Sequence, residues 1–502
     1  MKKNVMIYCI CFFVVGGLFA QTAVQPSGLG TEASPYLIES LDNLYWISQN
    51  AGTWGAWFQQ TADIDASETA TWNPDGAGGY HGWSPIGTDA VKFIGRYNGN
   101  DYTIRNLYIN RPETDYIGFI GYARNPDAVD GRPVIYQLGL LDVNFTGRDF
   151  TGALIGRIYG WYSGSSSWPT MHRALIHICY STGSVTGRNY TGGLVGNSDY
   201  TYIHYSYSTC DVIGAWRVGG FCGAITNYSP VWWCYSIGTV DGNQDVGGFT
   251  GFVNYYVNLK ACYSSGYVDN GVYIGGFVGI TDGHSYSATQ CYWDTESSGR
   301  ATSVLGTGKT TAQLKQQNYG SEWDFDNTWW MEAGQTRPLL RSARKQRIFT
   351  AHHLQLMTVD LASEYQIMRD LDLSCLQNPA DVWGTSETSG SGFVPIGDNS
   401  NPFTGSLDGT DFAIDGLYIN RGSSSSYNGL FGKTSGATIS NLSSTNGFVN
   451  GYWYTGGLIG KADNSTINQC YCEGTIFSSY YGGGLIGHVT NNSPVSYTHL
   501  RA

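Results

Sequence analysis

One short glycine phrase recurs at a fixed spacing and limits what this chain can fold into. The phrase Thr191-Gly192-Gly193-Leu194-Val195-Gly196 returns with small changes in three further copies, which end at Gly223, Gly251 and Gly279. The spacings of the last glycines are 223−196 = 27, 251−223 = 28 and 279−251 = 28. A constant period of this length is typical of a solenoid, in which each repeat buries its apolar face only against its neighbours.

A second signature precedes the glycine phrase in several copies. It reads Cys179-Tyr180-Ser181, Cys234-Tyr235-Ser236 and Cys262-Tyr263-Ser264, which alternates as a strand does. Each repeat therefore predicts a strand, a turn and a glycine-rich corner that runs into a short apolar strand. Stacked coils of this kind pair their strands in parallel about 4.8 Å apart.

The glycines are expected to form the corner because glycine lacks a Cβ atom. We expect positive φ angles there, close approach of neighbouring backbones, and inward-pointing Leu, Phe, Val or Ile residues after the glycines. The fold class predicted is an all-β tandem β-solenoid (β-helix) with about 27–28 residues per coil and short capping helices. The glycines assigned to the scaffold are Gly192, Gly193, Gly196, Gly219, Gly220, Gly223, Gly247, Gly248, Gly251, Gly275, Gly276, Gly279, Gly456, Gly457, Gly460, Gly483, Gly484 and Gly487.

The chain contains a tandem duplication of a whole module. The passage from Phe93 to Arg111 returns as Phe403 to Arg421, at an offset of 403−93 = 310. Short helices that begin after Ser40 and Thr350 are expected to cap the two modules. We therefore predict a first module with both caps at 21–340, in which residues 281–340 form the exit cap. The second module is predicted at 341–495 and stops before its own exit cap.

The two ends of the chain predict processing and an unrelated tail. Lys2 and Lys3 precede an apolar run from Val5 to Phe19, so residues 1–20 are expected to be a secretory signal peptide. Residues 496–502 match nothing earlier and are interpreted as a non-native tail. No later stretch approaches 18 apolar residues, so we expect an exported protein, secreted or at the cell surface, without a membrane span.

The charge balance argues against some partners. Lys and Arg number 27 and Asp and Glu number 39, which gives a formal net charge of −12. Affinity for nucleic acid depends mainly on Lys and Arg, so a nucleic-acid partner is not expected.

The repeat resembles a known family. Gly-Gly followed by Leu or Phe, Val or Ile and Gly at this period, with Cys-Tyr-Ser between copies, is similar to the GLUG-motif repeats of exported bacterial proteins. The resemblance covers roughly residues 93–293 and 403–487. It implies β-helical segments of adhesin-like surface proteins, some of which accompany immunoglobulin A peptidases. No catalytic residue travels with the repeat itself.

Motifs that could carry chemistry favour structural roles. The stretch Ser303–Thr310 imitates a phosphate-binding loop but has Ser303 in place of the required first glycine. The repeated acids (Asp63, Asp65, Asp101, Asp370, Asp372 and Asp411) recur in both modules, as residues at turns and strand starts do. The cysteines at 179, 234, 262 and 291 share one coil position, which leaves buried thiols, disulfides or metal binding open. We predict no catalytic residue, no cofactor and no metal site.

Aromatic side chains on the coils remain as candidate contacts. Tyr and Trp are ordinary strand residues, but outward rings can stack on sugars or anchor a protein. We predict a non-enzymatic, adhesin-like protein that presents an extended face to glycan or protein. A carbohydrate-active β-helix enzyme (polysaccharide lyase or glycoside hydrolase type) and a structural stalk for a missing C-terminal domain are the alternatives. The candidate ligand contacts are Tyr202, Tyr205, Tyr207, Trp232, Trp233, Tyr255 and Tyr256.

Overall fold

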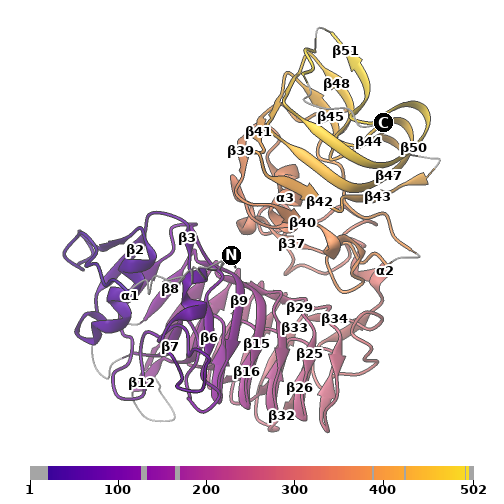
Figure 1. Ribbon diagram of the computed structural model, residues 1–502. Coiled ribbons are helices and arrows are strands. Elements are labelled where there is room, and N and C mark those ends of the chain that lie inside the picture. Colours follow the sequence, from indigo (N-terminus) through magenta and orange to yellow (C-terminus); the bar gives the residue numbers. More distant parts are fainter. Residues whose placement is uncertain are drawn as a thin grey trace, which may run out of the picture.

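A computed structural model describes residues 21–125, 133–163, 170–386, 389–422, 425–491 and 493–496. The predicted signal peptide, 1–20, and all but the first residue of the predicted tail lie outside these ranges. The described chain consists of stacked parallel strands, and the predicted β-solenoid fold is confirmed (Figure 1). No helix in the described ranges is long and apolar enough to cross a membrane.

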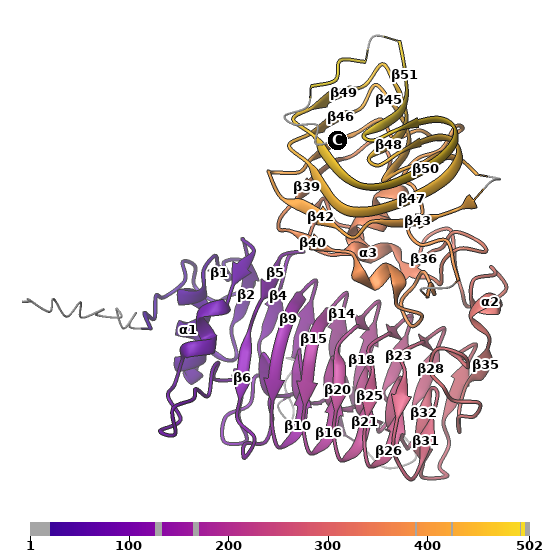
Figure 2. The same cartoon turned by 45° about the vertical axis from the view of Figure 1, so that its right-hand side comes forward.

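The strands of the first module lie side by side as successive coils (Figure 2). Each coil contributes to four parallel sheets, in which a strand pairs with its counterparts in the coils before and after it. The nine-stranded sheet contains β1 (Tyr36–Ile38), β2 (Trp57–Gln60), β4 (Arg96–Asn98), β8 (Val134–Tyr136), β14 (Ala174–His177), β18 (Thr201–His204), β23 (Pro230–Trp232), β28 (Asn258–Lys260) and β33 (Ser287–Thr289). The six-stranded sheet contains β7 (Ile120–Arg124), β11 (Ile155–Tyr159), β17 (Val195–Asp199), β22 (Cys222–Thr226), β27 (Thr250–Val253) and β32 (Val278–Thr281).

The other two sheets of this module are built in the same way. The five-stranded sheet contains β10 (Asp149–Gly152), β16 (Asn189–Gly192), β21 (Trp216–Gly219), β26 (Gln244–Gly247) and β31 (Ile274–Gly275). The thirteen-stranded sheet contains β3 (Ile64–Asp65), β5 (Thr103–Arg105), β6 (Tyr108–Asn110), β9 (Gly139–Thr146), β15 (Tyr180–Thr186), β19 (Tyr207–Ser208), β20 (Asp211–Ile213), β24 (Tyr235–Ser236), β25 (Val240–Asp241), β29 (Tyr263–Ser264), β30 (Val268–Asp269), β34 (Tyr292–Asp294) and β35 (Thr307–Lys309). Two antiparallel hairpins, β12–β13 (Trp161–Ser163, Thr170–His172) and β36–β37 (Trp329–Trp330, Leu339–Leu340), extend from the coils.

The second module repeats this architecture on a smaller scale. Its five-stranded sheet contains β38 (Arg347–Ile348), β39 (Glu364–Ile367), β41 (Ser406–Asp408), β46 (Thr438–Ser440) and β49 (Thr466–Asn468). A six-stranded sheet contains β40 (Leu371–Asp372), β42 (Ala413–Asp415), β43 (Tyr418–Asn420), β44 (Ser426–Asn428), β47 (Ser443–Gly456) and β50 (Tyr471–Gly483). A three-stranded sheet contains β45 (Phe431–Ser435), β48 (Ile459–Asp463) and β51 (Ile486–Thr490).

Short helices occur where the sequence predicts them. The hydroxyl groups of Ser40 and Thr350 accept hydrogen bonds from the backbone two or three residues into the helices that follow them, as N-cap residues do. The helices are α1 (Leu41–Gln49), α2 (Thr311–Leu314) and α3 (Ala351–Gln355), with 3₁₀ turns η1 (Ala51–Thr53), η2 (Ser67–Thr71), η3 (Arg341–Ala343), η4 (Leu356–Val359) and η5 (Ser374–Gln377).

The core consists of identical side chains stacked on successive coils. The rings of Phe221, Phe249 and Phe277 are fully buried and stack at 4.8 and 4.9 Å between centroids. Cys234 and Cys262 are buried free thiols one coil apart, on the inner side of the sheet. The apolar residues after the glycines therefore point inward, as expected.

The glycines act through close backbone approach and not through positive φ. A Cβ atom on Gly192 would lie 2.1 Å from the carbonyl oxygen of Val195, and one on Gly193 would lie 2.2 Å from that of Gly220. The positive φ angle falls instead on the residue two positions before the glycine pair, for example Tyr190 at 57°. The expectation of positive φ at these glycines is wrong, because the corner turns before the phrase begins.

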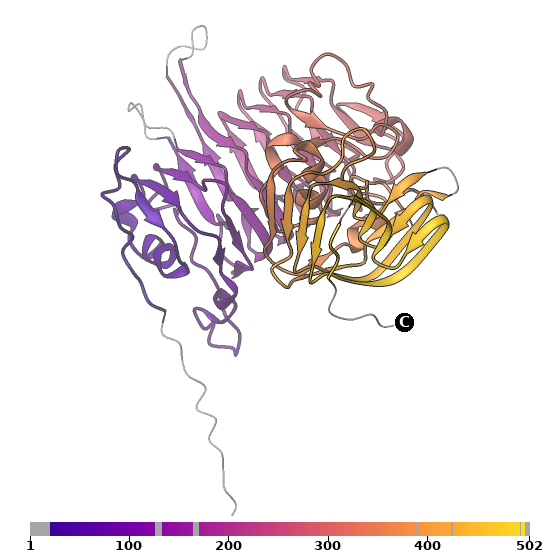
Figure 3. The ribbon, with the colours of Figure 1, turned by 90° about the horizontal axis from the view of Figure 1, so that it is seen from above.

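The second module packs against one side of the first. Figure 3, seen from above, shows it lying across the coils of the first module, with α1 well away from it. Tyr180, Tyr207, Tyr235 and Tyr263 of the first module belong to the same buried cluster as the core of the second. The ion pairs Arg347–Asp63, Lys345–Asp101 and Arg369–Asp142 continue this contact along the coils that precede the tyrosines.

Candidate functional site

Four of the predicted aromatic contacts lie together on the outer side of the nine-stranded sheet. In β18 and β23, Ile203 and Val231 point into the core, so Tyr202, His204 and Trp232 point outward. The strand register places His204 beside Trp232, and their ring centroids lie 5.7 Å apart. The ring centroid of Tyr202 lies 6.0 Å from that of Trp232.

Tyr205 and Trp233 directly follow His204 and Trp232 and extend this cluster beyond the ends of β18 and β23. Tyr205 and Trp233 have φ angles of 50° and 53°, a left-handed conformation that costs a non-glycine residue about 1 kcal/mol or more. Their rings stack with centroids 4.8 Å apart. The indole N–H of Trp233 donates to the carbonyl oxygen of Glu322 at 3.2 Å, which fixes this corner to the exit cap. We call Tyr202, His204, Tyr205, Trp232 and Trp233 the aromatic patch.

Two cationic side chains border the aromatic patch. The guanidinium group of Arg173 lies 4.7 Å from the centroid of the Tyr202 ring and donates to its hydroxyl oxygen at 3.0 Å. The ammonium group of Lys260 lies 5.5 Å from the Trp232 ring and 2.6 Å from a carboxylate oxygen of Glu322. The patch is therefore a half-buried row of rings with hydrogen-bond donors at its edges.

The imidazole group of His204 in the patch, and that of His177 beside it, are neutral at physiological pH. Burial, and to a smaller degree the charge of His177, lowers the pKa of His204 to about 4. Burial also lowers the pKa of His177, which lies on the preceding coil. Since both rings stay uncharged above pH 6.5, the patch offers aromatic surface without a buried positive charge.

Tyr255 and Tyr256 lie at another corner, between the six-stranded and the nine-stranded sheets. They are 41% and 53% exposed. Tyr256 stacks on Tyr228 at 4.7 Å, and Tyr255 stacks on His284 at 3.9 Å between centroids. The structure therefore divides the predicted contacts between two places.

Tyr207 is the predicted contact that the second module buries. It is 2% exposed and stacks between Tyr180 at 5.0 Å and Tyr235 at 4.7 Å. The column points away from the coil, but the second module covers it, with His352 6.4 Å from the Tyr207 ring. The repeat shows that Tyr207 points out of the coil without showing that the second module packs on it, and its role as a ligand contact stays a prediction.

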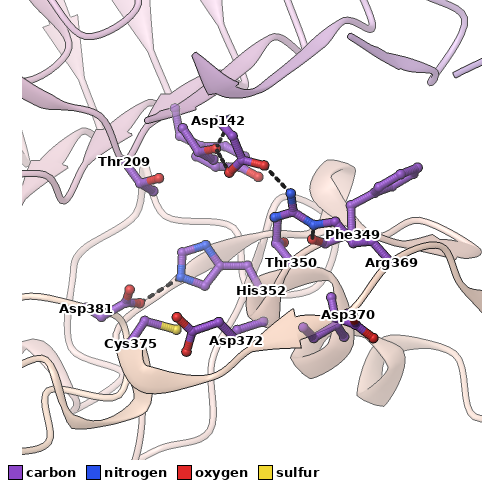
Figure 4. A pocket seen from close by; sticks show the side chains of 14 residues that line it. Asp142, Thr209, Phe349, Thr350, His352, Arg369, Asp370, Asp372, Cys375 and Asp381 are labelled. Atoms are coloured by element: carbon purple, nitrogen blue, oxygen red, sulfur yellow. Dashed lines mark hydrogen bonds and ion pairs between the residues drawn. The ribbon is translucent and has the colours of Figure 1, made fainter. Parts of the chain in front are cut away.

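A cavity of about 440 Å³ lies beside Tyr207, between the two modules (Figure 4). Arg369 pairs with Asp142 across it, and Nε2 of His352 lies 2.7 Å from Oδ1 of Asp381. Burial, with the nearby carboxylates of Asp381 and Asp372, raises the pKa of the Cys375 thiol well above its usual value. Cysteine nucleophiles react as thiolates, so this arrangement does not activate Cys375. In the described part of the chain, no group of three His, Cys, Asp or Glu side chains gathers to hold a metal ion.

A further aromatic column escaped the sequence analysis. Tyr116, Phe150 and Tyr190 stack at 5.2 and 4.6 Å at the corner before the glycine phrase. The guanidinium groups of Arg157 and Arg217 lie over this column, 5.2 Å from Phe150 and 5.0 Å from Tyr190. The sequence does contain a pattern that predicts this column, because an aromatic residue two positions before the glycine pair recurs in both modules.

Comparison with known proteins finds partial relatives. Halomucin from Haloquadratum walsbyi is 33% identical over 189 residues, which are 37% of this chain and 2% of that protein. A protein of Evansella cellulosilytica, provisionally named a Gly-rich membrane protein, is 37% identical over 150 residues, which are 28% of this chain and 15% of that protein. The chain thus matches only a small part of the length of these relatives.

Among solved structures, a protein from Bacteroides ovatus, provisionally described as an immunoglobulin A1 protease, is similar with a TM-score of 0.47 and 20% identity. The match covers 63% of this chain and 95% of that one. No protein-family model matches the sequence.

Proposed function

We propose that this chain is a non-enzymatic, secreted or cell-surface adhesin-like protein whose aromatic patch binds an extended glycan. The observation that carries the proposal is the row of rings on β18 and β23, in which Tyr202, His204 and Trp232 point outward beside one another. The C–H faces of sugar rings pack on Tyr and Trp, and the polar edges of these rings stay in water.

The setting of the patch favours an extended ligand over a small one. The patch lies on a sheet that continues along the module, so a chain of sugars can follow the coils. Arg173 and Lys260 place N–H donors at its border, where sugar hydroxyl groups would accept hydrogen bonds. A protein ligand would use the same rings as anchors, and it is the alternative ligand class.

The location outside the cell is supported by two observations. The first 20 residues have the charged start and apolar run of a secretory signal peptide. One partial relative carries the name of a membrane protein. We also propose membership of the GLUG-motif repeat group, on the phrase Gly192–Gly196 and its copies.

A glycan array probed with the mature chain tests the proposal. We expect binding to one class of polysaccharide, and at least a tenfold loss of affinity in Trp232→Ala and in Tyr202→Ala. Tyr267→Ala removes a tyrosine that is 46% exposed and outside the patch, and it is the matched control. Binding that survives both patch variants, or no binding to any glycan, would show that the patch is not a glycan site. Shortening of a polysaccharide by the purified chain would instead show an enzyme.

A further inference from the structure

A second cavity, of about 500 Å³, lies where the exit cap of the first module meets the second module. The exit cap contributes Glu332 and Gln335, from the loop between β36 and β37. The second module contributes Thr358 of η4, Asp398 and Arg421. The cavity shares no residue with the aromatic patch, and its size is typical of sites for small ligands.

The duplication supplies an internal comparison for Arg421. Its counterpart in the first module is Arg111, because 421−111 = 310. Nε of Arg111 donates to the carbonyl oxygen of Trp83 at 3.1 Å, and Nη2 donates to the hydroxyl oxygen of Ser84 at 3.1 Å. The first copy of this arginine is therefore held by bonds that stabilise the coil.

The second copy has fewer partners. Val394 replaces the serine, so Nη2 of Arg421 donates to the carbonyl oxygen of Phe393 at 3.1 Å instead. Nε of Arg421 is buried and has no hydrogen-bond partner among the described residues. Burial lowers the pKa of Arg421 to about 10, so the side chain remains a cation at neutral pH. Burying the Nε–H group without a partner costs free energy that the fold does not recover.

Oxygen atoms that can accept hydrogen bonds face the same cavity as the donor Arg421. The half-buried carboxylate of Glu332 makes neither a hydrogen bond nor an ion pair within the described ranges, and burial raises its pKa. Oε1 of Gln335 and Oγ1 of Thr358 are buried without partners there. Asp398 uses one carboxylate oxygen, Oδ1, for the backbone N–H groups of Ser400 and Asn401, both at 2.7 Å.

A cation and a carboxylate thus share one cavity without touching. A ligand that satisfies both must accept hydrogen bonds from Arg421 and donate hydrogen bonds to Glu332. A hydroxyl group does both at once, and a sugar ring carries several hydroxyl groups at the spacing of such side chains. A purely anionic ligand would meet Glu332 and Asp398, and a purely cationic one would meet Arg421.

We propose that this cavity is a binding site for a neutral sugar unit, held by Arg421 as donor and by Glu332 and Gln335 as acceptors. The site is assembled from both modules, so it exists only when the second module is docked on the exit cap. Its ligand is one or two sugar rings, in contrast to the extended chain proposed for the aromatic patch.

Isothermal titration calorimetry of the mature chain with neutral monosaccharides and disaccharides tests this site. We expect one of these sugars to bind, and Arg421→Gln and Glu332→Gln each to weaken its binding at least tenfold. Arg188→Gln, at a side chain that is 56% exposed and outside the cavity, is expected to leave the affinity unchanged.

Thermal unfolding distinguishes a binding role from a structural one. Arg421→Gln is expected to unfold at the wild-type temperature or above it, whereas Arg111→Gln loses two hydrogen bonds and unfolds at a lower temperature. The proposal is overturned if no neutral sugar binds, if binding survives both cavity variants, or if free amino acids bind in place of sugars. Amino acids are included in the titration because a zwitterion also pairs with both charges.

Discussion

The buried ion pair between Arg337 and Asp294 allows a sharp test of how the two modules are joined. Both side chains are 0% exposed. Nε of Arg337 donates to Oδ2 of Asp294 at 3.1 Å, and Nη2 donates to the carbonyl oxygen of Pro379 at 2.9 Å. Nη1 donates to the carbonyl oxygens of Ala380 and Asp381. The exit cap thereby holds the second module through one guanidinium group.

The variant Asp294→Asn removes the negative charge but keeps the size of the side chain and its oxygen. That oxygen caps the turn by accepting from the N–H groups of Glu296 at 3.0 Å and Ser297 at 3.1 Å. The buried cation then has no counter-charge, and breaking such a pair costs about 3–5 kcal/mol. We expect this loss in the free energy of unfolding, measured by urea denaturation with tryptophan fluorescence.

A matched control separates burial from pairing. Asp149→Asn weakens the ion pair with Arg188, which is 56% exposed, and such surface pairs contribute about 0–1 kcal/mol. The double variant Arg337→Met with Asp294→Asn removes both charges and is expected to be more stable than Asp294→Asn alone. A loss below 1 kcal/mol for Asp294→Asn, or a double variant no better than the single one, would refute the reasoning.

Three further predictions concern the coils. First, Phe249→Ala removes the middle ring of the buried phenylalanine stack and should cost about 3–5 kcal/mol in urea unfolding. Second, Gly193→Ala should lower the thermal unfolding temperature strongly, because the new Cβ atom would lie 2.2 Å from the carbonyl oxygen of Gly220. At Gly484 a new Cβ atom would have no atom within 4 Å, so Gly484→Ala should leave the unfolding temperature unchanged. Third, the low pKa of His204 favours its neutral form in the folded state. Its contribution to the free energy of unfolding is therefore present above pH 6.5 and is lost as the pH falls towards 4. We expect that loss to be about 1–2 kcal/mol after allowing for solvent screening, and absent in His204→Gln when stability is measured across this range.

The coil architecture follows from the sequence because its period is a direct physical constraint. Every coil must place the same kind of side chain at the same rung, so the phenylalanines after the glycine pairs could only stack on one another. The capping helices were equally readable, since Ser40 and Thr350 stand where an N-cap must stand. These features depend on neighbours along the chain or one coil away.

The candidate sites depend on contacts that periodicity does not contain. Tyr207 and Tyr202 both point outward, and only the docking of the second module separates a fully buried column from a half-buried ring. The left-handed φ of Tyr190 was also missed, because a large aromatic residue is an unusual choice for that conformation. Stacking on Phe150 offsets part of its cost, and that stacking is visible only in three dimensions.

The duplication gives a criterion for finding function on a repetitive scaffold. A position that keeps both its chemical group and its bonds in the two modules, as the N-capping hydroxyl groups of Ser40 and Thr350 do, is explained by the fold alone. Arg421 keeps its identity relative to Arg111 and a bond to the equivalent carbonyl oxygen, but it loses the bond to a hydroxyl group and its Nε has no partner among the described residues. The fold alone does not explain a half-buried cation whose hydroxyl partner has been replaced by valine, because removing the arginine would then cost little stability. By the same criterion, the outward ladder that runs from His177 through His204 and Trp232 to Lys260 changes residue at almost every rung, so it is a better place for recognition than the invariant tyrosine column.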